Sequence, residues 1–78
     1  MAADQQTRLR IELDYYAQHK GEWLVHKGGQ YVVIKDSTPL GFYQTFEAAY
    51  RAGAGAYGIE TDFLVKQILE YEPVFFVL

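Results

Sequence analysis

Two histidines and the glutamate between them are the side chains whose spacing first suggests chemistry. His19 and His26 lie seven residues apart, and Glu22 follows the first by three residues and precedes the second by four. On an unbroken helix all three share one side, an arrangement typical of metal ligands. The two imidazoles are roughly 10 Å apart along the axis, which is too far to bind one ion together. With no other ligand cluster in the sequence, we interpret both histidines as surface residues and predict no metal site.

The hydroxyl and glycine patterns do not favour catalysis or cofactor binding. Ser37 adjoins Asp36 in an expected turn, where such side chains usually bond the backbone rather than form a nucleophile with its base. The glycines of AGAGAYG, residues 52–58, lie inside an expected helix, whereas a phosphate-binding loop follows a strand and opens a helix. We therefore predict neither a catalytic residue nor a cofactor, and a protein that is not an enzyme.

Two pairs of carboxylates are the remaining candidates for acid–base chemistry. Glu12 and Asp14 are two residues apart on an expected helix, so their side chains point away from each other. Glu70 and Glu72 flank an expected turn. We expect both pairs to be solvated rather than buried in a cleft.

The tyrosines and the apolar C-terminal residues give the strongest functional indication. Tyrosine combines apolar area with a hydroxyl group and is typical of interface hot spots, although a small domain also needs large rings for its core. The tail VFFVL, residues 74–78, is short and wholly apolar, as expected of a strand that is buried or docked on a partner. The candidate interaction surface consists of Tyr15, Tyr43, Tyr50, Tyr71, Val74, Phe75 and Phe76.

Composition narrows the class of protein. The 78 residues correspond to one small domain, whose 17% aromatic content can supply a core without disulfides. The chain lacks cysteine, which fits a reducing compartment, and we predict a cytoplasmic protein. A net charge of −3 with scattered basic residues disfavours nucleic-acid binding. No apolar stretch approaches the ~20 residues of a membrane span, so a membrane role is also disfavoured.

The elements that must position these residues begin with a helix. Residues 1–6 are polar, and we expect them to be frayed. An apolar stripe then predicts an amphipathic helix that buries Trp23, that bends or splits at Gly21, and that ends at Gly28 and Gly29. The stripe consists of Leu9, Leu13, Tyr16, Lys20, Trp23 and Leu24.

A β-hairpin and a second helix follow. The run QYVVIK, residues 30–35, predicts a central strand with Val32 and Ile34 on one face and both faces partly covered. Turn residues 36–39 lead to a strand over 40–44, where Gly41 indicates a bulge or close packing under a ring. Thr45 is expected to cap a helix that carries an apolar stripe and ends at Gly58. We expect both internal glycines of this helix to pack close to the sheet.

Residues 63–69 predict a third strand, and residues 74–78 a fourth. The sequence thus predicts an α+β fold in the order α-β-β-α-β-β. We expect a two-layer sandwich with both helices on one face of a three- or four-stranded, mainly antiparallel sheet.

Several blocks in this order resemble a family of small bacterial proteins of unknown function. The blocks are GGQYVVIKD, LGFYQTFEAAYRAG, FLVKQI and EPVFF, and the resemblance covers residues 23–76. The chain differs from the pattern at Gln30, where lysine is usual, and by a longer turn at residues 37–39. The resemblance implies the α+β fold but assigns no functional residues.

We therefore expect a non-enzymatic module that binds a protein partner or self-associates, with a homodimer as one form. One alternative is a small-ligand or enzymatic pocket between helix and sheet, bordered by Trp23, His26, Tyr31 and Tyr50. Another is an inhibitor or antitoxin that blocks another protein.

Overall fold

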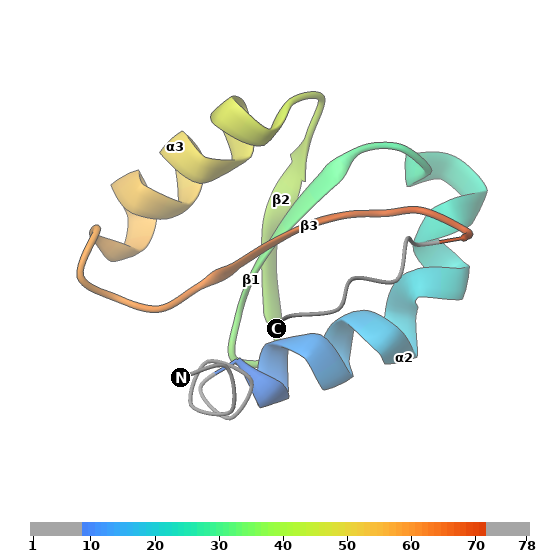
Figure 1. Ribbon diagram of the computed structural model, residues 1–78, viewed down its shortest axis with the longest axis horizontal. Helices are drawn as coiled ribbons and strands as arrows, with labels where there is room; N and C mark the ends of the chain where they lie inside the picture. Colours follow the sequence, from blue (N-terminus) through green and yellow to red (C-terminus); the bar gives the residue numbers. More distant parts are fainter. Residues whose placement is uncertain (1–8, 72–78) are drawn as a thin grey trace, which may run out of the picture.

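The computed structural model describes residues 9–71 and shows two helices around a three-stranded antiparallel sheet (Figure 1). The predicted order α-β-β-α-β is confirmed for this part of the chain. The fraying predicted for residues 1–6 and the fourth strand predicted for residues 74–78 lie outside the described residues. The elements are α2 (Arg10–Lys27), β1 (Tyr31–Lys35), β2 (Thr38–Tyr43), α3 (Phe46–Tyr57) and β3 (Leu64–Gln67).

Helix α2 is continuous through Gly21, which is exposed and has open space around it. The predicted split therefore does not occur, but the axis of α2 turns near its middle, in agreement with the predicted bend (Figure 1). The predicted apolar stripe does face the core. Tyr16 is buried, and four residues of the stripe pack around the same cluster: Leu9, Leu13, Trp23 and Leu24.

Strands β1 and β2 form a hairpin with a two-residue turn at Asp36 and Ser37. Thr38 and Pro39 belong to β2 rather than to the predicted longer turn, because an edge strand accommodates proline. The register shifts between Val33↔Gly41 and Ile34↔Pro39, which leaves one extra residue on β2. The bulge predicted at this point is confirmed. A Cβ atom on Gly41 would lie 2.8 Å from the Tyr43 hydroxyl, so the predicted cover by a ring is confirmed as well.

Helix α3 has the predicted caps. The Thr45 hydroxyl accepts a hydrogen bond from the Ala48 amide at 3.1 Å, and Gly58 ends the helix at a φ of 88°. Of the two internal glycines, only Gly53 is closely packed, since a Cβ there would lie 2.7 Å from Cδ1 of Phe63. Gly55 is exposed with nothing within 4 Å of such an atom, so the prediction of close packing was wrong for this residue.

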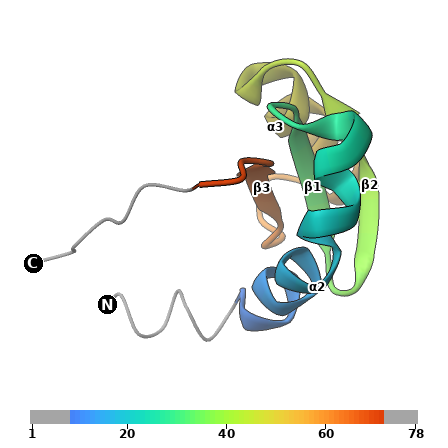
Figure 2. The ribbon, with the colours of Figure 1, turned by 90° about the vertical axis from the view of Figure 1, so that its right-hand side faces the viewer.

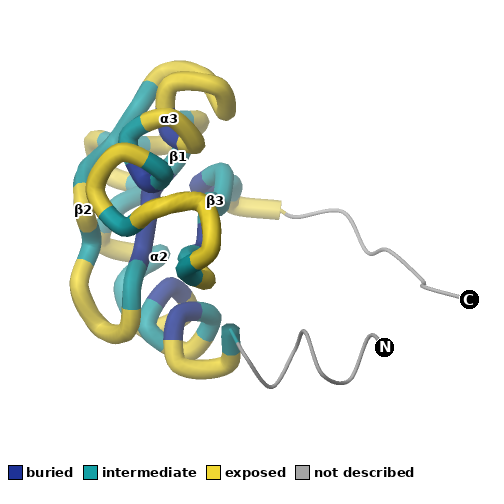
Figure 3. The backbone as a smooth tube through the Cα atoms, turned by 90° about the vertical axis from the view of Figure 1, so that its left-hand side faces the viewer, coloured by how far each residue is buried: buried dark blue, intermediate teal, exposed yellow. Residues whose placement is uncertain are grey.

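The sheet order is β2-β1-β3, which confirms that β1 is central. Strand β3 runs antiparallel to β1 and covers Leu64–Gln67, within the predicted range of 63–69. Both edge strands are therefore parallel to each other, and α3 is the connection that crosses from one edge to the other. Three consecutive β1 residues, Val32, Val33 and Ile34, are fully buried. Burial is deepest along β1 and on the inner sides of the helices (Figure 3).

The two helices cover opposite faces of the sheet, so the prediction that both lie on one face was wrong. Val32 and Ile34 pack with Tyr16 of α2 in the main core. Val33 points to the other face, where α3 lies with its fully buried residue Ala49. Figure 2 shows the strands side by side with α2 in front of them and α3 behind. The arrangement has three layers because a run of three buried strand residues needs cover on both faces.

Glu12 is buried, with only 3% of its surface exposed, so the expectation that this carboxylate is solvated was wrong. Its Oε2 atom accepts a hydrogen bond of 2.6 Å from the Asp36 amide in the hairpin turn. Asp36 has a φ of 56°, in the left-handed region. The other carboxylate oxygen, Oε1, is buried without a hydrogen-bond partner. Glu12 thus fastens the first turns of α2 to the tip of the hairpin.

Candidate interaction surface

A groove lies between α3 and the start of β3. It has a volume of about 370 Å³. We call it the α3–β3 groove and define it by Phe46, Tyr50, Ile59, Phe63 and Val65. Leu9, next to the first residue of α2, Leu64 of β3 and two residues of the α3–β3 connection complete the lining.

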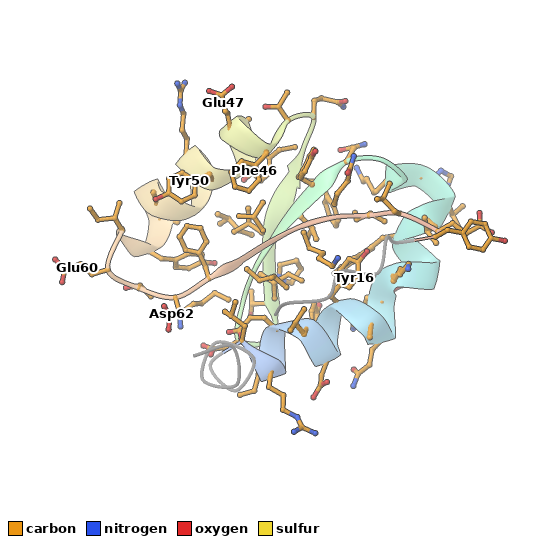
Figure 4. All side chains as sticks on the ribbon, in the orientation of Figure 1. Tyr16, Phe46, Glu47, Tyr50, Glu60 and Asp62 are labelled. Carbon is orange, nitrogen blue, oxygen red and sulfur yellow. The ribbon has the colours of Figure 1, made fainter. Side chains whose placement is uncertain are left out.

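The groove walls include large apolar side chains that remain in contact with solvent. Phe46, Tyr50 and Ile59 are 52%, 45% and 79% exposed. The rings of Phe46 and Tyr50 are stacked, with centroids 6.2 Å apart, and Tyr50 also contacts the Phe63 ring at 5.8 Å. Figure 4 shows Phe46 and Tyr50 side by side on α3. A continuous apolar surface of this kind is typical of an interaction site.

The rings are exposed because α3 approaches the sheet through its smallest residues. Ala49 and Gly53 are the buried residues of α3, and Gly53 allows the Phe63 ring to lie directly against the helix backbone. Phe46 and Tyr50 lie on the same apolar stripe but at its margin. The sequence stripe therefore predicted the inward face of α3 correctly, yet it did not show that its buried members would be Ala49 and Gly53 while Phe46 and Tyr50 stay exposed.

Among the residues that the structure describes, β3 pairs with another strand only on its β1 side, so alternate backbone groups of β3 face away from the sheet. The Ile68 amide donates to the Gln30 carbonyl at 2.8 Å, which fixes the hydrogen-bonding phase of the ladder between β1 and β3. In an antiparallel pair, alternate residues direct their amide and carbonyl groups toward the partner strand. The backbone amide and carbonyl of Lys66 therefore point toward β1, whereas those of Val65 and Gln67 point outward. The Gln67 carbonyl accepts a hydrogen bond from the Tyr16 hydroxyl at 3.1 Å, as this phase requires.

One acidic side chain, Asp62, lines the groove in the connection before β3. Glu60 precedes it in the same connection, whereas Glu47 lies in the first turn of α3, away from the start of β3 (Figure 4). All three are exposed.

The predicted surface tyrosines do not form one patch. Tyr50 belongs to the groove, and Tyr43 shares the α3 face of the sheet through its register with Tyr31. Tyr15 packs on the opposite side, against His19 and Trp23 of α2. Tyr71 lies beyond β3 and is 85% exposed. The three tail residues of the predicted surface, Val74, Phe75 and Phe76, lie outside the described residues.

An aromatic cluster on α2 accounts for the first histidine. The His19 ring stacks on Trp23 with centroids 5.6 Å apart, and Trp23 meets Phe42 of β2 at 5.3 Å. The His19 Nδ1 atom lies 3.0 Å from an oxygen of Glu22, a pairing that the three-residue spacing indicated. His26 is exposed in the last turn of α2. In the described part of the chain, no group of three or more histidine and acidic side chains is arranged to hold a metal ion.

The residues proposed to border a helix–sheet pocket are divided between the two faces. Trp23 packs on the α2 face, whereas Tyr31 contacts Phe46 on the α3 face. The residues of this set, Trp23, His26, Tyr31 and Tyr50, therefore do not line one cavity. Of the helices in residues 9–71, none is long and apolar enough to cross a membrane.

Of the groove residues, only Tyr50 was predicted as a site residue. Phe46 was assigned to the apolar stripe of the second helix, and Phe63 and Val65 to the strand predicted over residues 63–69, whereas Ile59 had no assigned role. One feature of the sequence could have indicated the groove. Two small residues of the expected helix, Ala49 and Gly53, alternate along its apolar stripe with two large ones, Phe46 and Tyr50. No family model matches the chain, and neither a curated protein nor a solved structure matches it.

Proposed function

We propose that this chain is a non-enzymatic protein-interaction module that binds an extended polypeptide segment along β3. The segment adds a strand to the sheet, and its alternate side chains enter the α3–β3 groove. Strand addition gives affinity through backbone hydrogen bonds and specificity through pockets for every second side chain.

One observation carries this proposal: Val65, whose amide and carbonyl face away from β1, lines the same groove as the exposed rings of Phe46 and Tyr50. Backbone groups alone would accept any strand, and rings alone would mark a general apolar patch. Their combination suits an extended segment with apolar residues at alternate positions. An inhibitor or antitoxin that blocks another protein is one form of the same activity, and we place the interaction in the cytoplasm as part of this proposal.

A peptide-display selection tests the proposal. Wild-type protein should enrich extended sequences with apolar residues at every second position. Val65→Pro should abolish their binding, because proline removes the outward amide while the ladder to β1 keeps its hydrogen bonds. Tyr50→Ala should weaken binding at least tenfold through the loss of an aromatic anchor.

Two matched controls separate the groove from other surfaces. Val65→Thr keeps the amide and should bind as the wild type does. Tyr15→Ala alters the aromatic cluster on the opposite face and should leave binding unchanged. Equal binding by Val65→Pro and wild type would contradict the proposal.

A further inference from the structure

We infer that the segment bound in the α3–β3 groove is residues 74–78 of a second copy of this chain. This inference rests on the proposed function and names its partner. Each chain would place its own apolar tail on β3 of the other, forming a two-fold symmetric dimer.

The length and composition of the tail fit the open edge. Strand β3, Leu64–Gln67, extends over roughly 14 Å at about 3.4 Å per residue, and the backbone groups of Val65 and Gln67 face away from β1. The tail VFFVL has five residues, one more than this strand, and all of them are β-branched, aromatic or otherwise apolar. Such a tail needs an apolar surface, and the α3–β3 groove supplies one beside the open edge.

The alternation of the strands determines which tail side chains enter the groove. In an antiparallel arrangement, Val74 lies opposite Gln67, Phe76 opposite Val65 and Leu78 opposite Phe63. Directly opposite residues point to the same face of a sheet, so Phe76 would enter the groove beside Tyr50. Phe75 would point to the α2 face.

A second copy fits better than the chain's own return. Ile68 is fully buried and bonded to Gln30, which fixes the chain to the end of the ladder. Beyond it the described chain leads away from the sheet, and Tyr71 is 85% exposed (Figure 2). Only two residues then separate Tyr71 from Val74, and one of them is Pro73. A tail that crosses to another molecule does not have to reverse within this short connection.

The area that two tails can bury approaches that of a specific interface. The four phenylalanine side chains of two tails contribute on the order of 600–1,000 Å². The branched side chains and the backbone add to this, which brings the contact near the ~1,200 Å² at which specific interfaces begin. When the same two copies exchange tails reciprocally, the contact is two-fold symmetric and the assembly closes at two chains.

Molar mass in solution tests this inference with full-length protein. By light scattering and sedimentation equilibrium, wild type should have twice the monomer mass of 9.0 kDa. Val65→Pro and Phe76→Asp should each be monomeric, whereas Val65→Thr and Phe76→Leu should remain dimeric. Circular dichroism checks that each variant is folded. Phe76→Asp changes only the tail, so it provides the test if Val65→Pro disturbs the sheet.

Mixing the two monomeric variants is the sharper experiment. Val65→Pro retains a normal tail, and Phe76→Asp retains a normal edge, so the mixture should form a heterodimer joined by one tail. A wild type that is monomeric at all concentrations, or a dimer that survives both substitutions, would overturn the inference. So would a mixture that stays monomeric although both variants are folded.

A labelled peptide of residues 72–78 distinguishes this failure from failure of the proposed function. If wild type is monomeric but binds the peptide, and Val65→Pro does not, the groove binds strands and the second copy is the wrong occupant. If wild type is monomeric and binds neither this peptide nor any peptide from the display selection, both proposals fail.

Discussion

The two edge strands of the sheet, β2 and β3, differ in how regular a row of backbone hydrogen-bonding groups each could offer to a further strand. Strand β2 carries Pro39 and a bulge, two features that interrupt a regular row of hydrogen-bonding groups. Strand β3 pairs with β1 in an unbroken register and has neither feature. Within residues 9–71, the Tyr16 hydroxyl reaches one of its outward groups, the Gln67 carbonyl. The difference between the two edges supports β3, rather than β2, as the edge for the strand addition that we propose.

The difference between the two edges depends first on which β3 residues direct their backbone amides toward β1 and which direct them outward. Lys66→Pro removes an amide that faces β1, and we expect a loss of about 3 kcal/mol in the free energy of unfolding. Val65→Pro removes an outward amide, and its loss should stay below about 1 kcal/mol. Urea unfolding of both variants checks the assignment. Equal losses would show that the hydrogen-bonding phase is wrong.

The groove beside β3 depends on the close approach of α3 at Gly53. Gly53→Leu would press a side chain into the Phe63 ring, and we expect it to lower the free energy of unfolding by about 1–3 kcal/mol. Gly55→Leu, two residues away in open space, is the matched control and should raise it by roughly 0.5–1 kcal/mol. Thermal and urea unfolding measure both effects. A stabilising Gly53→Leu would contradict the packing described for the groove.

The hairpin that carries the protected edge is fastened to α2 by Glu12. Glu12→Ala removes the acceptor of the Asp36 amide, and we expect a loss of about 1–2 kcal/mol. Glu12→Gln keeps an acceptor and should lose less. Asp14→Ala changes an exposed carboxylate of the same helix and should stay within about 0.5 kcal/mol of wild type. If Glu12→Ala and Asp14→Ala are equivalent in urea unfolding, the buried hydrogen bond does not stabilise the fold.

The smallest effect is expected at Pro39. Pro39→Thr restores an amide to β2 but leaves the bulge in place, so the free energy of unfolding should change by less than about 0.5 kcal/mol. Binding of the peptide of residues 72–78 should also be unchanged, as measured by fluorescence anisotropy. Additional peptide bound by this variant would show that proline alone protects the β2 edge.

The hairpin and the helix caps could be predicted from the sequence because their causes are local. Thr45 and Gly58 act within one turn of α3, and the β-branched run of β1 favours a strand wherever it lies. The positions of the helices relative to the sheet depend on distant contacts. The run Val32, Val33 and Ile34 indicated that both faces are covered, but periodicity does not show which element covers which face.

The difference between local and distant causes also explains why the predictions for the burial of Glu12 and Phe46 were wrong. Glu12 is spaced like a solvated helix residue, and its partner is an amide 24 positions away in a left-handed turn residue. Such a partner leaves no periodic signal in the sequence. The exposure of Phe46 likewise depends on Ala49 and Gly53 forming the helix contact, which the apolar stripe by itself does not show.

The exchange of the Val65 and Lys66 amides with solvent deuterium tests the difference between the edges most directly. These neighbouring amides point in opposite directions, so NMR on the wild-type chain provides its own control. We expect Lys66 to be protected at every protein concentration and Val65 to become protected only as the concentration rises and tails occupy β3. A Val65 amide that exchanges freely at all concentrations, while Lys66 stays protected, would contradict strand addition between copies at this edge.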